Sequence, residues 1–254
     1  MRNLCLLALL CAPLAMAESL VKVAPHSLLR LPTHASTLQL DRLEIADHAS
    51  LLLPANLSEL RVGELRMGRD AHIGIAPSET AFVLDVAQGE IAEGSHIGAR
   101  GAPGNYDRPA SAGRTLALRL EQVQVESLSI DARGGRGTPG YRGLDGAKGQ
   151  PAGCLWGDAG RGYDGQNGGD GQDGAPGGKV RLEVPADFPV ERIQVRLEGG
   201  AGGPAGEPGE GGPGGAAKGC LLYRADGSAK GRPGQPGQPG AQGAEGQLEV
   251  VRFE

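Results

Sequence analysis

Residues 231–246 read GRPGQPGQPGAQGAEG, in which every third residue is glycine. Runs with the same period begin at Gly134, Gly162 and Gly200, and each of the four runs contains six such glycines. Glycine at every third position is typical of polyproline II helices, either in a collagen triple helix or in a bundle of separate helices. The period therefore predicts long extended segments that pack closely on one another.

Two cysteines occupy matching places between the paired runs. Cys154 lies 20 residues after Gly134, and Cys220 lies 20 residues after Gly200. At a rise of ~3.1 Å per residue, each cysteine would stand ~60 Å from the start of its run. We therefore expect two long hairpins that lie side by side and are joined near their ends by a Cys154–Cys220 disulfide. Two free thiols or intermolecular bridges are the alternatives.

The N-terminal sequence has the features of a secretory signal peptide. MRNLCLLALLCAPLAMA (1–17) combines a basic start, an apolar stretch and an Ala-x-Ala end, so we expect cleavage before Glu18 and an exported chain. Cleavage removes Cys5 and Cys11 and leaves one possible intramolecular pair. No other segment approaches the ~20 apolar residues of a membrane-spanning helix, so no membrane span is expected.

The composition argues against nucleic-acid binding. The chain has 30 acidic and 25 basic residues, and the charges are scattered without a basic block. A nucleic-acid-binding protein needs a basic patch or stripe. Aromatic residues make up only 3% of the chain, so any core must be aliphatic.

A repeat of 22 residues precedes the glycine runs. HSLLRLP (26–32) aligns with HASLLLP (48–54), and Val23, Ile45 and Met67 follow one another at intervals of 22. Short stretches with alternating apolar residues predict strands with one buried face. A unit this small cannot enclose its own core, so units must stack, which predicts an all-β fold: a short β-solenoid of about seven coils.

The glycine runs enter at one recurring place in these coils. We expect N-terminal coils over 18–97 and further coils over 98–254, interrupted by hairpins at 98–114, 134–178 and 199–247. Neighbouring coils are ~4.8 Å apart, so hairpins that leave the same corner of consecutive coils must lie against each other. The expected result is a side bundle of six antiparallel polyproline II helices.

Glycine content predicts which segments lie inside the bundle. GGAGGPAGEPGEGGPGG (199–215) has surplus glycines outside the period of three, whereas 231–246 has one glycine per triplet. A segment surrounded by others needs glycine on more than one side, because its neighbours' backbones approach closely. We therefore place 199–215 inside and 231–246 outside.

Two groups of known proteins share these features. The triplets of 203–215 and 231–246 resemble those of bacterial exported collagen-like proteins, many of which are trimeric surface or matrix proteins. The hairpins are similar to the antiparallel polyproline II bundles of snow flea antifreeze proteins, of the glycine-rich domain of Obg-type GTPases and of phage tail-tip adhesins. We favour the bundle, because runs joined in pairs by short connections must be antiparallel whereas collagen strands are parallel.

Aromatic and apolar residues gather where the hairpins turn. Loops on a rigid scaffold often carry binding, so these residues are candidate binding residues. The alternative is that they only pack around the disulfide. They are Tyr106 at the first turn, Leu155 and Trp156 at the second, and Leu221, Leu222 and Tyr223 at the third.

Two further sets of polar residues recur in register. One face of the second hairpin carries Asp164, Asn167, Asp170 and Asp173. A calcium ion needs six to eight oxygen ligands, which this stripe cannot supply alone, so we expect a solvated face. Histidines align in pairs, His26 with His48 and His72 with His96. No acidic or cysteine ligand recurs beside them, so we expect surface histidines and no metal site.

The chain contains no H-E-x-x-H, G-x-S-x-G, P-loop or C-x-x-C motif. We therefore expect neither an enzyme nor a cofactor. Our hypothesis is an exported structural or adhesive protein of the cell surface or extracellular matrix, which presents its tips to a glycan, a protein or another copy. The periplasm is the alternative location. A collagen-like trimeric spacer is one alternative, and an ice-binding protein, implied by the insect resemblance, is another.

Overall fold

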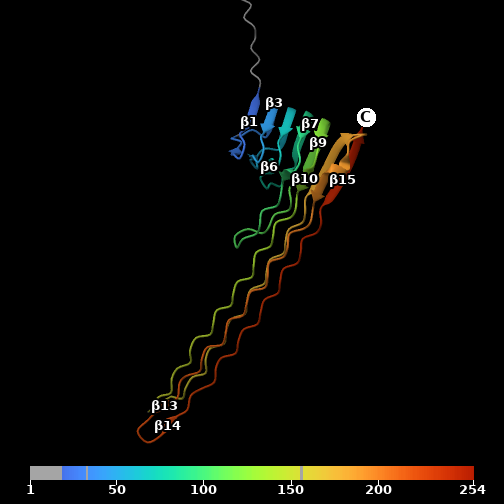
Figure 1. The fold of residues 1–254 in the computed structure, drawn as a ribbon. Coiled ribbons are helices and arrows are strands. Elements are labelled where there is room, and N and C mark those ends of the chain that lie inside the picture. Colours follow the sequence, from blue (N-terminus) through green and yellow to red (C-terminus); the bar gives the residue numbers. More distant parts are fainter. Residues whose placement is uncertain (1–18, 33, 155–156) are drawn as a thin grey trace, which may run out of the picture.

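The computed structural model describes residues 19–32, 34–154 and 157–254 (Figure 1). The expected signal peptide, 1–17, lies outside the described residues. Two parallel β-sheets form the body of the protein, and the body strands alternate between them along the chain. The seven-stranded sheet contains, in spatial order, β1 (Leu20–Val23), β3 (Thr37–Ile45), β5 (Glu59–Met67), β7 (Phe82–Ile91), β9 (Leu116–Val125), β11 (Lys179–Pro185) and β15 (Gln247–Phe253).

The six-stranded sheet lies opposite, and its strands are likewise parallel to one another. It contains β12 (Ile193–Arg196), β10 (Leu128–Asp131), β8 (Ser95–Gly98), β6 (His72–Ile75), β4 (Ser50–Leu53) and β2 (Leu28–Arg30). A single 3₁₀ turn, η1 (Val190–Arg192), precedes β12 within the described residues. A two-stranded sheet of β13 (Lys218–Gly219) and β14 (Arg224–Ala225) lies at the far end of the molecule.

Strand register follows the sequence repeat. Leu20 pairs with Arg42 and Arg42 pairs with Glu64, so β1, β3 and β5 are offset by 22 residues each. Between β7 and β9 the offset is 34, because Phe82 pairs with Leu116. The longer offset accommodates the first glycine-rich stretch without disturbing the pairing of the strands on either side of it.

Each long strand of the seven-stranded sheet bends once. In β3, Leu40 and Leu43 are both buried, and the pairing with β5 skips Asp41 between them. A straight strand buries every second residue, so two buried residues three positions apart require a change of direction. The bent strands thus enclose the apolar core on two sides. Inward residues of the six-stranded sheet, such as Leu51 and Ile73, close the remaining side.

Arg114 fixes the start of β9 to the body. Its guanidinium is 1% exposed and donates hydrogen bonds to the carbonyl oxygens of Leu57 (2.6 Å), Ala76 (3.0 Å) and Thr80 (2.9 Å). It also lies over the Phe82 ring, 5.3 Å from the centroid. Burial lowers the pKa of this guanidinium. Nothing in the neighbouring sequence distinguishes Arg114 from the exposed arginines, so its burial is visible only in the fold.

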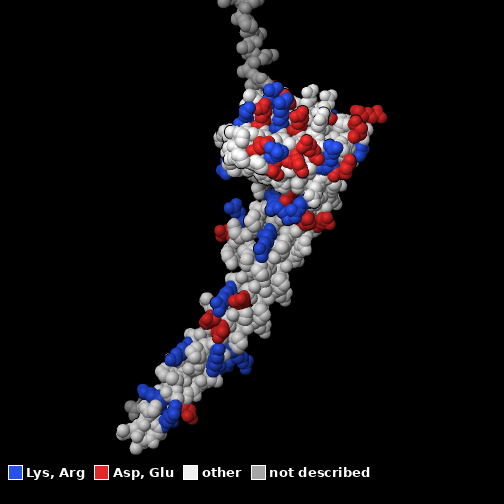
Figure 2. Space-filling model, in the orientation of Figure 1, with Lys and Arg blue, Asp and Glu red and all other residues white. Residues whose placement is uncertain are grey.

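Ion pairs cover the outer face of the seven-stranded sheet (Figure 2). Neighbouring strands are bridged at Lys22–Glu44 (3.0 Å) and at Arg42–Glu64 (2.7 Å). Such exposed pairs contribute little to stability. They do account for the mixed blue and red surface of the body, which contrasts with the sparsely charged glycine-rich part in the same view.

The structure corrects the fold expected from the sequence, a short β-solenoid with a side bundle of six antiparallel polyproline II helices. Two large parallel sheets in two layers form the body. The glycine-rich part extends from the end of the strands instead of covering their side (Figure 1). The first stretch, 98–114, turns back early, so four segments reach the far end, and they make parallel as well as antiparallel contacts.

Candidate functional site

Four glycine-rich arms form a rod that extends from the body (Figure 1). We call 134–150 arm 1, 160–178 arm 2, 199–215 arm 3 and 228–246 arm 4. Arms 1 and 2, 2 and 3, and 3 and 4 run antiparallel, whereas arms 1 and 3, and 2 and 4, run parallel. Arms 2 and 3 each contact the three others. The predicted inner position of 199–215 and outer position of 231–246 are therefore found.

Backbone hydrogen bonds join the arms at every third residue. In arm 3, Gly203 donates to the carbonyl of Gln172 in arm 2 at 2.8 Å. The carbonyl of Pro204 accepts from Gly140 in arm 1 at 2.9 Å, and that of Gly206 accepts from Gly237 in arm 4 at 3.1 Å. Because the pattern repeats along the rod, the amide groups of the period glycines are satisfied within the chain.

The arms approach so closely that side chains are excluded between them. A Cβ on Gly206 would lie 2.0 Å from the carbonyl oxygen of Tyr141, and one on Gly168 would lie 2.1 Å from that of Gly206. These neighbours are backbone atoms, which cannot rotate away. Glycine at these positions is therefore a steric requirement of the rod.

The acidic stripe of arm 2 is exposed, as the sequence predicts, and it also holds arm 4. The side-chain oxygens of its residues accept backbone N–H groups of arm 4 at 2.6–2.8 Å. In each of these triplets of arm 4, the glycine N–H donates a hydrogen bond to arm 3, and the N–H of the next residue donates to a side chain of this stripe. The third position of the first three triplets from Gly231 is proline, which has no N–H and so leaves no donor unpaired. The bonded pairs are Asp164–Arg232, Asn167–Gln235, Asp170–Gln238 and Asp173–Ala241.

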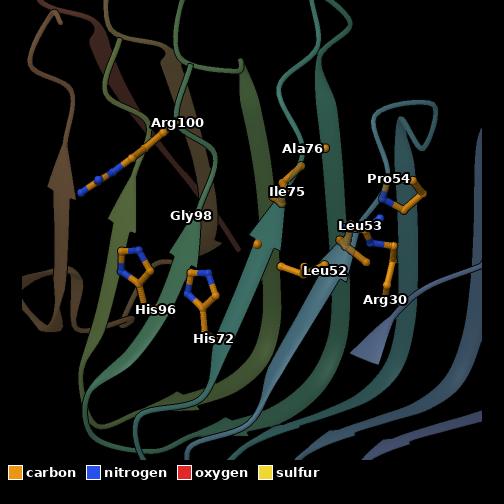
Figure 3. A pocket seen from close by; sticks show the side chains of 11 residues that line it. Arg30, Leu52, Leu53, Pro54, His72, Ile75, Ala76, His96, Gly98 and Arg100 are labelled. Atoms are coloured by element: carbon orange, nitrogen blue, oxygen red, sulfur yellow. The ribbon is translucent and has the colours of Figure 1, made fainter. Parts of the chain in front are cut away.

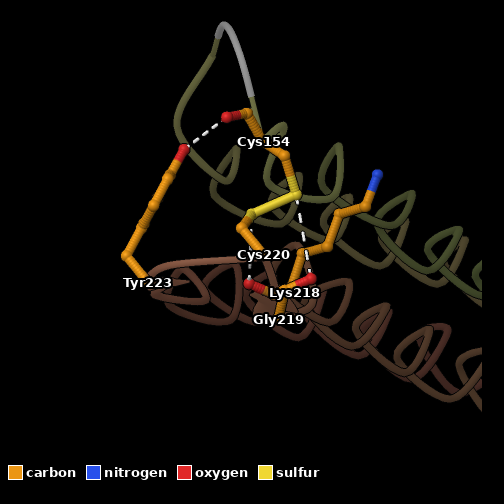
Figure 4. The surroundings of a disulfide bond; sticks show 5 residues. All are labelled: Cys154, Lys218, Gly219, Cys220 and Tyr223. Carbon is orange, nitrogen blue, oxygen red and sulfur yellow. Dashed lines mark hydrogen bonds between the residues drawn. A yellow bond between two sulfur atoms is a disulfide. The ribbon is translucent and has the colours of Figure 1, made fainter.

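A disulfide locks the far end of the rod (Figure 4). Cys154 and Cys220 are bonded, with Cα atoms 5.6 Å apart, which confirms the predicted pairing. The Tyr223 hydroxyl donates a hydrogen bond to the carbonyl oxygen of Cys154. The Cys220 N–H donates to the Tyr223 carbonyl at 2.8 Å and closes the β13–β14 hairpin. The two long hairpins are thus joined by both a covalent bond and hydrogen bonds.

The turn of that hairpin carries exposed apolar side chains. Leu221 is 99% and Leu222 is 93% exposed, whereas Tyr223 is 55% exposed and is oriented by its hydrogen bond. Leu221 and Leu222 therefore do not pack around the disulfide. The predicted tip residues Leu155 and Trp156 lie outside the described residues.

Tyr106, grouped with these residues in the sequence analysis, lies elsewhere. Its loop leaves the rod near the body, where Gly104 donates to the carbonyl of Arg136 at 2.8 Å. There Tyr106 and Tyr141, both largely exposed, line a concavity of about 350 Å³ together with Arg108. The hairpin lengths could have separated the two groups, because 98–114 is much shorter than 134–178 and 199–247 and therefore turns back nearer the body.

The aligned histidines form two stacked pairs: His72 and His96 lie on β6 and β8 of the six-stranded sheet, and His26 and His48 lie in the turns before β2 and β4. The ring centroids of His72 and His96 are 4.9 Å apart, and those of His26 and His48 are 5.0 Å apart. Burial lowers the pKa of His72, and the neighbouring His96 adds to this effect. Burial also lowers the pKa of His96, against a smaller opposing effect of Asp131.

The His72–His96 pair borders a groove of about 720 Å³ (Figure 3). Its floor contains Gly74 and Gly98, which are register partners across the neighbouring strands β6 and β8. Leu52, Leu53, Pro54, Ile75 and Ala76 supply an apolar side. Arg30 and Arg100 lie toward opposite ends of the view.

Neither a metal centre nor a relative identifies the chain. In the residues that the structure describes, no cluster of three His, Cys, Asp or Glu side chains is arranged to hold a metal ion. No described helix is long and apolar enough to cross a membrane. Comparisons with protein families, with curated proteins and with solved structures found no match.

Proposed function

We propose that this is an exported, non-enzymatic adhesive protein of the cell surface or extracellular matrix, in which the rod presents its tip to a partner. The observation that carries this proposal is the exposure of Leu221 and Leu222 at the disulfide-locked end. Exposed apolar groups on a constrained turn are a typical feature of interaction sites. The partner is a surface or matrix component, either a glycan or a protein, or a second copy of the chain.

The construction of the rod supports a presenting role. Hydrogen bonds at every third residue join four arms, so the rod resists bending better than a single extended chain. The disulfide keeps the two hairpin ends together under load. A persistent disulfide is also typical of an oxidising compartment, which supports export.

The same contacts weigh against the two alternatives. A collagen-like trimer would use glycine N–H groups between chains, whereas here they donate within one chain. An ice-binding face would need regular small or threonine side chains, whereas the outward positions of arm 4 include Arg232, Gln235 and Glu245. Light scattering and thermal hysteresis of the purified chain test these alternatives directly.

Adhesion under flow tests the proposal. Beads carrying the full chain should be retained on matrix or cells of the source organism, and Leu221→Ser with Leu222→Ser should reduce retention severalfold. Leu144→Ser with Leu20→Ser is the matched control, because both leucines are exposed but lie away from the tip. Equal retention of the tip variant and the wild type would refute the proposal.

A further inference from the structure

We propose that the groove beside His72 and His96 binds an acidic polysaccharide. This site lies on the body, on the outer face of the six-stranded sheet, and is separate from the tip of the rod. The inference is independent of the proposed adhesive role, and it assigns to the body a ligand of its own. Shape, charge and hydrogen-bonding capacity each contribute to it.

The shape of the groove depends on two glycines. Across β2, β4, β6 and β8 the outward residues at one register are Arg30, Leu52, Gly74 and Gly98. Glycine inside a strand weakens the strand, and it often marks a place where another molecule approaches closely. A Cβ at Gly98 would lie 3.1 Å from the His72 ring, so larger side chains here would occupy the groove.

The exposed charge of the groove is positive. No aspartate or glutamate lines it, and Arg30 has no ion pair or hydrogen bond within the described part of the chain. Arg100 pairs with Asp131 at 2.6 Å, but the Asp131 side chain is 1% exposed whereas that of Arg100 is 56% exposed. Three strand spacings separate β2 from β8 by about 14 Å. A ligand that meets both arginines must therefore be extended and carry more than one anionic group.

The remaining lining favours a saccharide over a peptide. Neither His72 nor His96 hydrogen-bonds another group within the described residues, so their ring nitrogens are available to hydroxyl groups. The apolar side suits the C–H faces of sugar rings. Peptides commonly bind sheets by adding a strand to an edge. That mode is closed at β4, β6 and β8, which are each paired on both sides, and only β2 lies at an edge of the sheet beside the groove.

Titration calorimetry with an α-1,4-linked galacturonate oligomer tests the proposal. The full chain should bind it, the affinity should fall as salt is raised from about 0.05 to 0.5 M, and the neutral methyl ester should bind at least tenfold more weakly. Poly-glutamate serves as the acidic peptide. Equal affinity for the oligomer and its ester, or for the oligomer and poly-glutamate, would overturn the assignment.

Variants locate the binding in the groove. Arg30→Ala should weaken binding roughly tenfold, the effect of losing one charge-assisted contact. Gly98→Leu should abolish binding by filling the floor. Arg61→Ala is the control, because Arg61 is an exposed arginine on the opposite sheet. Leu221→Ser with Leu222→Ser should leave the affinity unchanged, which separates this site from the tip. Wild-type affinity in both groove variants would refute the proposed site.

Discussion

Asp170 accepts the backbone N–H of Gln238 through its Oδ1 atom at 2.7 Å, across 68 residues of sequence. Asn167 does the same for Gln235 at 2.8 Å and the same separation. Parallel arms leave one backbone N–H per triplet without a backbone acceptor, and the side chains of arm 2 supply that acceptor. The stripe is thus part of the backbone hydrogen bonding of the rod.

Removing one acceptor of this stripe should loosen arm 4 locally. Asp170→Ala should cost about 1 kcal/mol in the free energy of unfolding and speed hydrogen exchange at Gln238. Asp170→Asn should retain both, because Asn167 fills the equivalent role naturally. Unchanged exchange at Gln238 in the alanine variant would contradict this account.

Glycine inside the rod should not tolerate a methyl group. Gly206→Ala places a Cβ 2.0 Å from the Tyr141 carbonyl oxygen, so we expect destabilisation by about 3 kcal/mol or more. Gly219→Ala is the matched control, because nothing lies within 4 Å of its Cβ position. Thermal unfolding followed by circular dichroism compares the two. Similar melting temperatures would show that the arms are not packed as described.

Loss of the disulfide should separate the hairpin ends. Cys154 and Cys220 are 66 residues apart, and closing a loop of this size stabilises the folded state by about 4 kcal/mol. The double serine variant should be cleaved by proteases near 218–225 while the body stays resistant. Peptide mapping without reductant checks the bond in the wild type. Free thiols there would contradict the assignment.

Arg114→Met should be strongly destabilising. It removes the donor of four carbonyls, those of Ala55, Leu57, Ala76 and Thr80, and we expect a loss of about 3 kcal/mol or more. Arg119→Met is a suitable control, because Arg119 also lies over an aromatic ring, that of Phe253, but is exposed at the surface. Its loss should cost less than about 1 kcal/mol. Denaturant unfolding measures both, and equal losses would refute a special role for Arg114.

Stability should rise with pH through the range in which His72 and His96 titrate. Burial holds the pKa of both imidazoles below the ordinary value of 6.5 in the folded state. The unfolded chain therefore binds more protons in this range, and stability is lost as the pH falls from 6.5 through the lowered pKa values. His72→Gln with His96→Gln should flatten this dependence. Denaturant midpoints at several pH values test it, and an equally steep slope in the double variant would show that other groups are responsible.

Residue identity alone was enough to predict several of these features. The period of 22 predicted the register of β1, β3 and β5, because stacked strands pair residues one repeat apart. The surplus glycines of 199–215 predicted its inner position, whereas arm 2, which also contacts three arms, mostly has one glycine per triplet and was not recognisable as an inner segment. The pairing of Cys154 with Cys220 followed from their matched reach along the two hairpins.

The amino-acid order by itself therefore determined the strand register, the glycine spacing of the arms and the covalent link at the tip, because each depends on distances counted along the chain. Tertiary structure alone decided that two parallel sheets form the body and that the rod continues from the strand ends. It also decided that the acidic stripe meets arm 4 and that Arg114 is buried. These features depend on which distant segments become neighbours, and that is settled by the packing of the whole chain.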